Sequence, residues 1–497
     1  MKDQLYESFD FYIKYAAANL KQPPASFEVE EKENISVSHI DPAYQLRNIS
    51  DKIESSREFN NLVSTFSAGL GRKTKRPPSD PNRQERNVLK NFFRRSRTYL
   101  NMYQGASIDI DECFERLMTA FAERNIKVTL LRLIEEVYFP EDLIDFGAFK
   151  IKRFSKKDLD DLFENQINHI FYPYAESNTE KLCWYWFLQQ ERSENRPQGD
   201  ISQITIKFSW SSLFRVSMTF PDRAIQLLTL FDWESKFFAR PNDIKSDSGW
   251  LSFSRPISFS VTDDIFANPS PTPNITDLEF FPQVNPYGEE DGEAPPFYID
   301  LDEEELKRLK TIIGNALGLL ENLDLKACNW EFIDRAMGYL AKAFFTEGLE
   351  QLLWHITVLE TLFGEKDEIL ESLRSRMSSI LAKTQAEKKS IRKMVNELYD
   401  FRSDLVHGNP ITKTVYKGHL RQARQLARDS MLWFLTYLSS IKPELLGKGV
   451  PSNNYPHRKE LLTLLDLKKE SLGRLSFLIE KLPNHFPNID IWGQEHK

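Results

Sequence analysis

The chain has 497 residues, more than one hydrophobic core commonly organises, and this length favours two or three domains. Its composition, 41% hydrophobic and 28% charged, is that of an ordinary globular protein. The formal net charge of −8 excludes a general electrostatic attraction to nucleic acid, so any contact with RNA or DNA must use a local basic patch.

The three cysteines, Cys113, Cys183 and Cys328, lie far apart in the sequence and form no CxxC or Cys/His cluster. This spacing argues against a disulfide framework and a structural zinc site, and it fits a reducing compartment. Acidic residues interrupt the apolar residues near the start, and no run of about 18 apolar residues follows. We therefore expect a cytoplasmic protein with no membrane segment, no metal and no cofactor.

Residues 1–70 mix short helical patterns with polar stretches and give no clear prediction. The segment 71–98 is strongly basic, and its Pro-Pro and Asp-Pro pairs predict a loop followed by a helix. The apolar residues of this helix are Leu89, Phe92 and Phe93. Its arginines are Arg94, Arg95 and Arg97. These cations allow two interpretations, a contact with nucleic acid or a solvated basic surface, and charge runs are more commonly the second.

Residues 125–265 have the alternating apolar pattern of strands that are buried on one face. Three such runs occur, at 201–210, 213–220 and 257–261. Because little more than two serines separate the first two runs, they are predicted to pair as an antiparallel hairpin. Between Phe149 and Phe163, a short strand is expected to lead into a helix that Ser155 and Asp158 cap.

Residues 266–299 are rich in proline, glycine and acid and lack periodicity, so we interpret them as a linker. It ends an N-terminal region of residues 1–265. Helical periodicity resumes at Asp302 and Glu305, which resemble a capping box. Six helices are then predicted, at 302–322, 329–346, 347–363, 367–382, 386–407 and 414–441.

The last residues, 446–497, are interpreted as a second linker and an amphipathic helix at 458–481. The sequence thus predicts a multidomain fold. An α+β N-terminal region precedes an all-helical bundle over residues 300–445.

The most informative segment is IRKMVNELYDFRSDLVHGNP, residues 391–410. Arg402 follows Leu398 by four residues and precedes Leu405 by three, which predicts that it shares the apolar face of its helix. An unpaired buried guanidinium is unfavourable, so Arg402 requires a partner or a functional role. His407 stands directly before a glycine, where the helix is expected to end. In an ideal helix, side chains five residues apart point in directions about 140° apart. Arg402 and His407 can therefore converge only because the helix ends there or because a second subunit completes the site.

The local sequence YDFRSDLVHG, with its Arg-x4-His spacing, resembles the signature of the HEPN superfamily, and in particular its Apea-like branch. The upstream segment DRAMGYLAKAFFTEGLEQLLWHITVLETLFGE resembles the first helical pair of that family, with Glu360 at its acidic position. The resemblance covers about residues 300–445. It implies a HEPN-type bundle of four or more helices that usually dimerises, so that two motifs face each other in one composite site.

The resemblance also implies metal-independent cleavage of RNA, in which the ribose 2′-hydroxyl attacks the adjacent phosphate. His407 would be the general acid/base, and Arg402 would steady the phosphate or the transition state, a task that suits a bidentate guanidinium. Glu360 would pair with Arg402 and hold it, the alternative being a glutamate at the helix edge that points to water. Ser403 and Asp404 would help to position RNA or His407.

Four cations follow the motif at spacings of four, three and four: Lys417, Arg421, Arg424 and Arg428. They predict one basic face on the last helix of the bundle, either a phosphate-binding stripe for RNA or a solvated helix face. Of the other histidines, His355 is expected in ordinary packing or at the surface, and His419 is expected to be exposed.

The sequence therefore favours a homodimeric endoribonuclease of HEPN type that acts on cellular RNA, with tRNA as one candidate substrate. Antiviral defence or toxin-like growth arrest is a role that the resemblance alone suggests. Two alternatives stay open. The helical domain can be a non-catalytic dimerising module that binds RNA or protein, and residues 1–265 can be a sensor that binds a trigger. That region contains no Gly-rich phosphate loop, GxSxG motif or metal-ligand spacing.

Overall fold

The computed structural model describes residues 2–20, 42–69, 82–123, 125–135, 137–164, 167, 170–171, 179–195, 222–233, 258–267, 281–284, 290–294, 299–322, 325, 330–344, 346, 348–365, 369–408, 413–440 and 458–466. The chain divides into two compact units. Unit 1 comprises residues 1–133, 151–220 and 257–294, and unit 2 comprises residues 134–150, 221–256 and 295–497. The division differs from the sequence-based boundary near residue 265, because two segments of the predicted N-terminal region group with the C-terminal helices.

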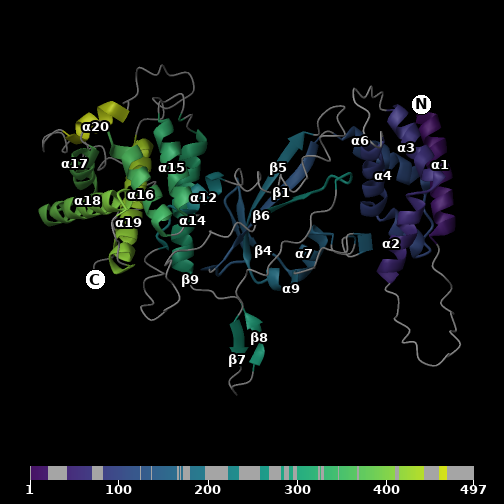
Figure 1. Ribbon diagram of the computed structural model, residues 1–497, viewed down its shortest axis with the longest axis horizontal. Helices are drawn as coiled ribbons and strands as arrows, with labels where there is room; N and C mark the ends of the chain where they lie inside the picture. The colour runs from purple at the N-terminus through teal and green to yellow at the C-terminus, as the bar shows by residue number, and fades with distance from the viewer. Residues whose placement is uncertain are drawn as a thin grey trace. The chain divides into compact units, whose positions relative to one another are not determined.

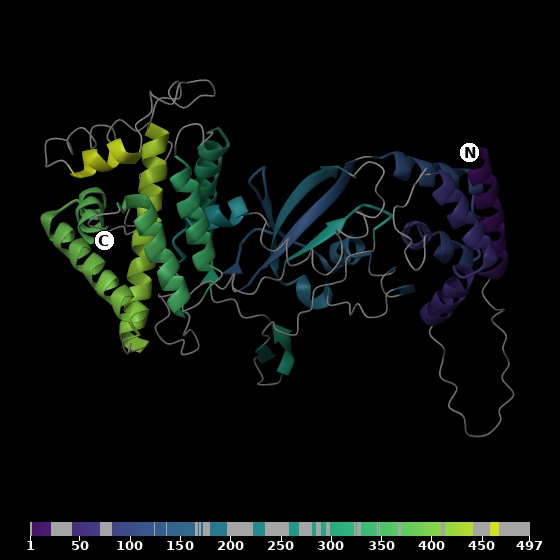
Figure 2. The same ribbon diagram turned by 45° about the horizontal axis from the view of Figure 1, so that its top comes forward.

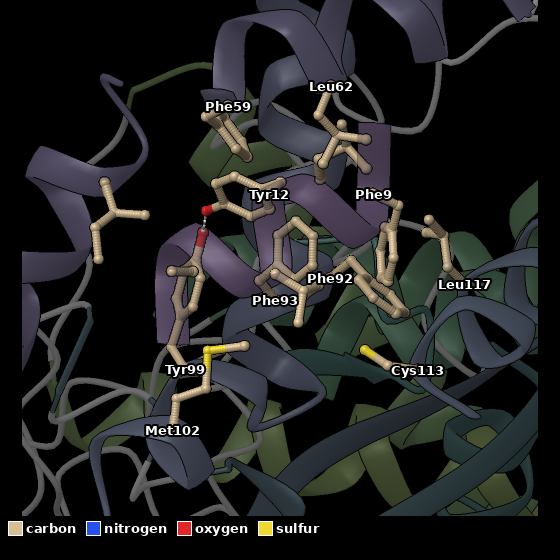
Figure 3. Packing of buried hydrophobic residues seen from close by; sticks show 14 of the residues in the cluster. Phe9, Tyr12, Phe59, Leu62, Phe92, Phe93, Tyr99, Met102, Cys113 and Leu117 are labelled. Atoms are coloured by element: carbon tan, nitrogen blue, oxygen red, sulfur yellow. Dashed lines mark hydrogen bonds between the residues drawn. The ribbon is translucent and has the colours of Figure 1, made fainter. Parts of the chain in front are cut away.

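Unit 1 begins with a group of helices, of which the sequence clearly predicted only the one after the basic segment (Figure 1). They are α1 (Lys2–Asn19), α2 (Pro42–Ile53), α3 (Arg57–Gly69), α4 (Arg83–Arg95), α5 (Thr98–Tyr103) and α6 (Ile110–Ala122). Their buried faces meet in an aromatic core in which Phe9, Tyr12, Phe59 and Phe93 are fully buried (Figure 3). The Tyr12 and Tyr99 hydroxyls form a hydrogen bond inside this core, so neither buried hydroxyl lacks a partner.

The predicted helix after the basic segment is confirmed as α4, but its arginines form internal ion pairs. Arg94 donates from Nε and Nη2 to the buried carboxylate of Glu54, at 2.8 and 2.6 Å. Arg95 pairs with Glu164 at 2.6 Å. Because both guanidinium groups are held by carboxylates of unit 1, neither the nucleic-acid interpretation nor the solvated one describes them. Arg97, in contrast, is exposed and has a left-handed backbone with φ of 62°.

Unit 1 also contains a small sheet (Figure 1). Its strands β4 (Lys150–Arg153), β5 (Trp186–Asn195), β1 (Asn125–Ile134) and β6 (Ser258–Thr262) stand next to one another in that order. β1 and β6 are antiparallel, with Leu131 opposite Phe259, which confirms the predicted strand at 257–261. The predicted hairpin of 201–210 and 213–220 lies outside the described residues.

The predicted strand-to-helix connection after Phe149 is also confirmed. β4 leads into α7 (Lys156–Leu162), and Ser155 and Asp158 form the expected reciprocal capping box. The short helix α9 (Thr179–Leu182) follows. Within the predicted linker, β7 (Phe281–Val284) and β8 (Glu290–Ala294) pair as an antiparallel hairpin, a structure that the composition of this segment did not indicate.

Unit 2 is mainly a helical bundle, which appears in green to yellow in Figures 1 and 2. All six predicted helices are confirmed, with ends shifted by two residues or fewer. They are α14 (Glu303–Asn322), α15 (Glu331–Phe344), α16 (Gly348–Phe363), α17 (Ile369–Leu381), α18 (Gln385–Val406) and α19 (Lys413–Ser440). Asp302 and Glu305 form the predicted capping hydrogen bonds at the start of α14, at 2.8 and 3.1 Å.

Short elements from earlier in the chain complete unit 2. β2 (Val137–Tyr138) pairs in parallel with β9 (Ile299–Asp300), and β3 (Leu143–Asp145) follows β2. Helix α12 (Asp222–Leu228) has buried residues and packs against α14 and α15. These long-range contacts are the reason why segments of the predicted N-terminal region belong to the C-terminal unit.

Helix α20 (Arg458–Asp466) is attached to the bundle by charge as well as by packing. The nearly fully buried guanidinium of Arg376 in α17 donates to both carboxylate oxygens of Asp466, at 2.8 and 2.6 Å. Three leucines of α20 are buried: Leu461, Leu462 and Leu465. The predicted helix extended to 481, and its residues beyond 466 lie outside the described part. None of the helices described in the structure is long and apolar enough to cross a membrane.

Candidate functional site

Helix α18 carries the Arg-x4-His motif, and its sequence determines both of its ends. Thr384 and Glu387 form a capping box at the start. His407 is the C-terminal cap, and its backbone N–H donates to Ser403 O at 2.9 Å. Gly408 follows with φ of +74°, a left-handed conformation that glycine adopts at low cost. The predicted end of the helix at this point is confirmed.

The buried face of α18 includes Phe401 and leaves Arg402 at its margin. Ile391, Val395, Leu398 and Phe401 are all buried, whereas the side chain of Arg402 is 38% exposed. The expectation that Arg402 shares the apolar face is therefore wrong. Phe401 and Arg402 follow Leu398 by three and four residues, and both spacings place a side chain on the same face of a helix as Leu398. In the structure, the ring of Phe401 occupies the buried position on this face.

Phe401 also determines the environment of His419. Their rings stack with centroids 4.5 Å apart and an interplanar angle of 18°. His419, on α19, is half-buried as a result, and the prediction that it is exposed is wrong.

The predicted pairing of Glu360 with Arg402 is confirmed. Glu360 lies on α16, and its Oε1 is 3.5 Å from Nη2 of Arg402. The Tyr399 hydroxyl, one turn before Arg402, donates to the same carboxylate oxygen at 3.0 Å. The guanidinium carbon lies 5.5 Å from the centroid of the Tyr399 ring. Two groups of α18 thus share one carboxylate of α16, which restricts where the guanidinium can point.

The environment of Tyr399 keeps its phenol neutral. Burial and then the charge of Glu360 raise the pKa of Tyr399 to about 12, so that the hydroxyl remains a hydrogen-bond donor at neutral pH. Sequence reasoning did not assign a role to Tyr399. Its position three residues before Arg402 was the available signal, because residues at this spacing are neighbours on a helix surface.

The residues after Arg402 are exposed at the end of α18. Ser403, Asp404 and His407 all lie at the surface. Because α18 stays helical through Val406, the rotation of about 140° between Arg402 and His407 applies in full. The end of the helix therefore does not bring the side chains of Arg402 and His407 together within one chain. Of the two possibilities that the sequence allowed, the one that involves a second subunit is left. Within the described residues, Arg402 is paired with Glu360 and not with His407.

The predicted basic face of α19 is not formed as expected. Arg424 and Arg428 are only 1% and 6% exposed. Arg424 donates to Gln351 at 3.1 Å, and Arg428 pairs with Asp232 at 2.8 Å. Arg421 is exposed, and the side chain of Lys417 lies outside the described part. Because cations at spacings of three and four also fit a buried face, the pattern alone could not separate a phosphate-binding stripe from internal pairs.

His355 lies in the core beside these residues and is fully buried, one of the two environments that the sequence suggested. Burial and the positive charge of Arg424 hold the pKa of His355 well below its usual value. A neutral imidazole at this position belongs to the packing of α16 rather than to the surface that carries Arg402.

Among the described residues, no cluster of three or more His, Cys, Asp or Glu side chains could hold a metal ion. In comparisons with known proteins, no protein-family model, curated protein or solved structure matches this chain. The candidate site therefore consists of the Glu360–Tyr399–Arg402 group and the exposed end of α18 at His407.

Proposed function

We propose that this protein is a metal-independent endoribonuclease of HEPN type. The observation that carries the proposal is the ion pair between Glu360 and Arg402, which holds a partly exposed guanidinium five residues before an exposed histidine. A cation that is fixed yet accessible to solvent suits recognition of a phosphate group. The resemblance of YDFRSDLVHG to the HEPN signature gives this cation its proposed substrate, the RNA backbone.

The chemistry divides between the two motif residues. The ribose 2′-oxygen attacks the adjacent phosphorus, and the bond from phosphorus to the 5′-oxygen breaks. His407 exchanges the protons, which leave the 2′-hydroxyl and arrive at the 5′-oxygen, since an imidazole can act as acid and base near neutral pH. Arg402 stabilises the charge on the phosphate oxygens, and Glu360 with Tyr399 keeps the guanidinium in position. The products carry a 2′,3′-cyclic phosphate and a 5′-hydroxyl.

A second copy of the chain is part of this proposal. Within one chain, Arg402 and His407 project from α18 in directions about 140° apart, so one phosphate cannot contact both from the same side. Two copies related by a twofold axis can bring Arg402 of one subunit near His407 of the other.

The proposal is tested by incubating the purified protein with tRNA in the presence of EDTA. We expect cleavage that survives the chelator and is lost in Arg402→Ala and in His407→Ala. Lys389→Ala removes an exposed cation from the same helix and serves as the matched control. Mixing the two inactive variants should restore part of the activity, since a mixed dimer holds one intact arginine and one intact histidine.

Two results would contradict the proposal. One is cleavage that persists unchanged in both motif variants. The other is RNA binding without cleavage in the wild-type protein, which would favour the non-catalytic dimerising module instead. Failure of the mixed variants to recover activity, with both single variants inactive, would reject the composite site but not the nuclease.

A further inference from the structure

Two aromatic rings of unit 2 are stacked outside the candidate site. Tyr339 of α15 and Trp354 of α16 have ring centroids 5.5 Å apart and an interplanar angle of 16°. Both side chains are half-buried. The Trp354 indole N–H donates to Glu350 at 3.2 Å, which fixes the orientation of the ring. Stacked rings that keep part of their surface accessible can accept a further planar group.

One cation lies against this aromatic pair, and a second lies on the same stripe of α15. The ammonium of Lys342 lies 4.6 Å from the centroid of Trp354 and 5.5 Å from that of Tyr339. Arg335 precedes Tyr339 by four residues, and Lys342 follows it by three, so all three occupy one stripe of α15. Both cations are exposed. A row of cation, aromatic ring and cation has the charge and the shape to bind a planar base together with the phosphates beside it.

The aromatic pair and the candidate site share the exposed side of α16. The half-buried residues of this helix between 353 and 361 occupy one arc of about 120°, with Trp354 at one margin and Glu360 at the other. Thr357 lies between them. Six residues separate Trp354 from Glu360, which corresponds to about 9 Å along the helix axis. A short extended ligand can therefore contact both ends of the arc.

We propose that Tyr339, Trp354, Arg335 and Lys342 form a platform that binds single-stranded RNA and directs it toward Arg402. A base stacks on the accessible surface of the aromatic pair, and the two cations contact neighbouring phosphates. The strand must be single because a paired base offers its face only to its neighbours in the helix. This inference rests on the proposed function, since it names how the RNA substrate is held.

The test measures binding of a 12-nucleotide single-stranded adenosine RNA to the full-length protein with His407→Ala, so that cleavage does not intervene. Trp354→Leu should weaken binding roughly tenfold, as expected for one lost base stack. The slope of affinity against salt should stay unchanged in this variant, because indole carries no charge. Lys342→Ala should instead reduce that slope by about one, as expected for one lost phosphate contact.

Trp184→Leu is the matched control, since Trp184 is a half-buried tryptophan of unit 1, and it should bind the RNA normally. The exposed Lys342 provides a second variant that leaves the packing intact if Trp354→Leu does not fold.

Wild-type affinity in both variants would overturn the platform while leaving the nuclease proposal intact. An equal loss of affinity for a 12-base-pair RNA duplex would also overturn the platform. A change in the mass of the protein particle in solution in Trp354→Leu would overturn it as well, because this surface would then be a contact between proteins. Loss of cleavage in the motif variants, measured separately, tests the proposed function alone.

Discussion

Glu360 of α16 accepts a hydrogen bond from the Tyr399 hydroxyl at 3.0 Å and pairs with Arg402 at 3.5 Å through the same carboxylate oxygen. The two partners lie on one surface of α18, one turn apart. This arrangement connects the helix that carries the motif to the helix that carries Trp354. It also makes the position of the guanidinium dependent on a charge from a different helix.

Replacement of Glu360 by glutamine should separate the effect of charge from that of shape. Glu360→Gln keeps an acceptor for Tyr399 but removes the attraction to Arg402. RNA cleavage should fall roughly tenfold, equivalent to about 1.4 kcal/mol of transition-state stabilisation. The free energy of unfolding should change by less than about 1 kcal/mol, because Arg402 is partly exposed. Glu397→Gln removes a surface charge that pairs with Lys393 and should leave cleavage unchanged.

The same substitution should lower the pKa of Tyr399 from its value of about 12, because the charge of Glu360 contributes to raising it and glutamine carries no charge. A raised phenol pKa stabilises the fold fully below pH 10, and this contribution is lost as the pH rises toward 12. Absorbance titration of ionised tyrosine, with the Tyr399→Phe protein as the reference, measures the shift. An unchanged pKa in Glu360→Gln would show that the carboxylate does not act on this phenol.

The stability of the protein should decrease in mild acid because His355 is buried in its neutral form. Its folded-state pKa lies well below 6.5, owing to burial and to the charge of Arg424. The unfolded chain therefore takes up a proton first, and stability falls as the pH drops below about 6.5. The slope from this group approaches about 1.4 kcal/mol per pH unit. Urea unfolding between pH 7.5 and 5 should show a weaker dependence on pH in His355→Leu than in the wild-type protein.

Two arginines of α19 should differ sharply in their contribution to folding. Arg428 is buried and pairs with Asp232 at 2.8 Å, so Arg428→Ala removes the guanidinium from this buried ion pair. Breaking such a buried pair destabilises a protein by about 3–5 kcal/mol. Arg421, on the same helix, is exposed, and Arg421→Ala should change the free energy of unfolding by less than about 0.5 kcal/mol. Equal effects in urea unfolding would show that Arg428 is not an internal pair.

The hydroxyl pair in the core of unit 1 should show strong coupling in a double-mutant cycle. Tyr12→Phe leaves the buried Tyr99 hydroxyl without this partner and should destabilise the protein by about 1–3 kcal/mol. Tyr99→Phe should do the same to Tyr12. The double variant should lose less than the sum of the two, because no hydroxyl remains unsatisfied. Strict additivity in chemical denaturation would mean that the two hydroxyls act independently.

The local signals in the sequence predicted much of unit 2. Capping residues such as Asp302 and Thr384, and the glycine after His407, determine where helices begin and end through interactions within a few residues. The same local logic predicted the strand and capped helix at 150–162. Local signals gave no clear prediction for residues 1–70, because the helices there are buried by contacts with segments that are distant in the sequence.

The sequence by itself determined the helices of unit 2 and the ends of α18, and it offered Glu360 as one possible partner of Arg402. Tertiary structure decided which side chains at helical spacing face inward. Phe401 rather than Arg402 entered the core, and Arg424 and Arg428 turned to partners on other segments. The physical reason is that positions three and four residues apart lie equally well on one face of a helix, so the choice between them depends on long-range packing and on charges such as Asp232 that no local pattern reveals.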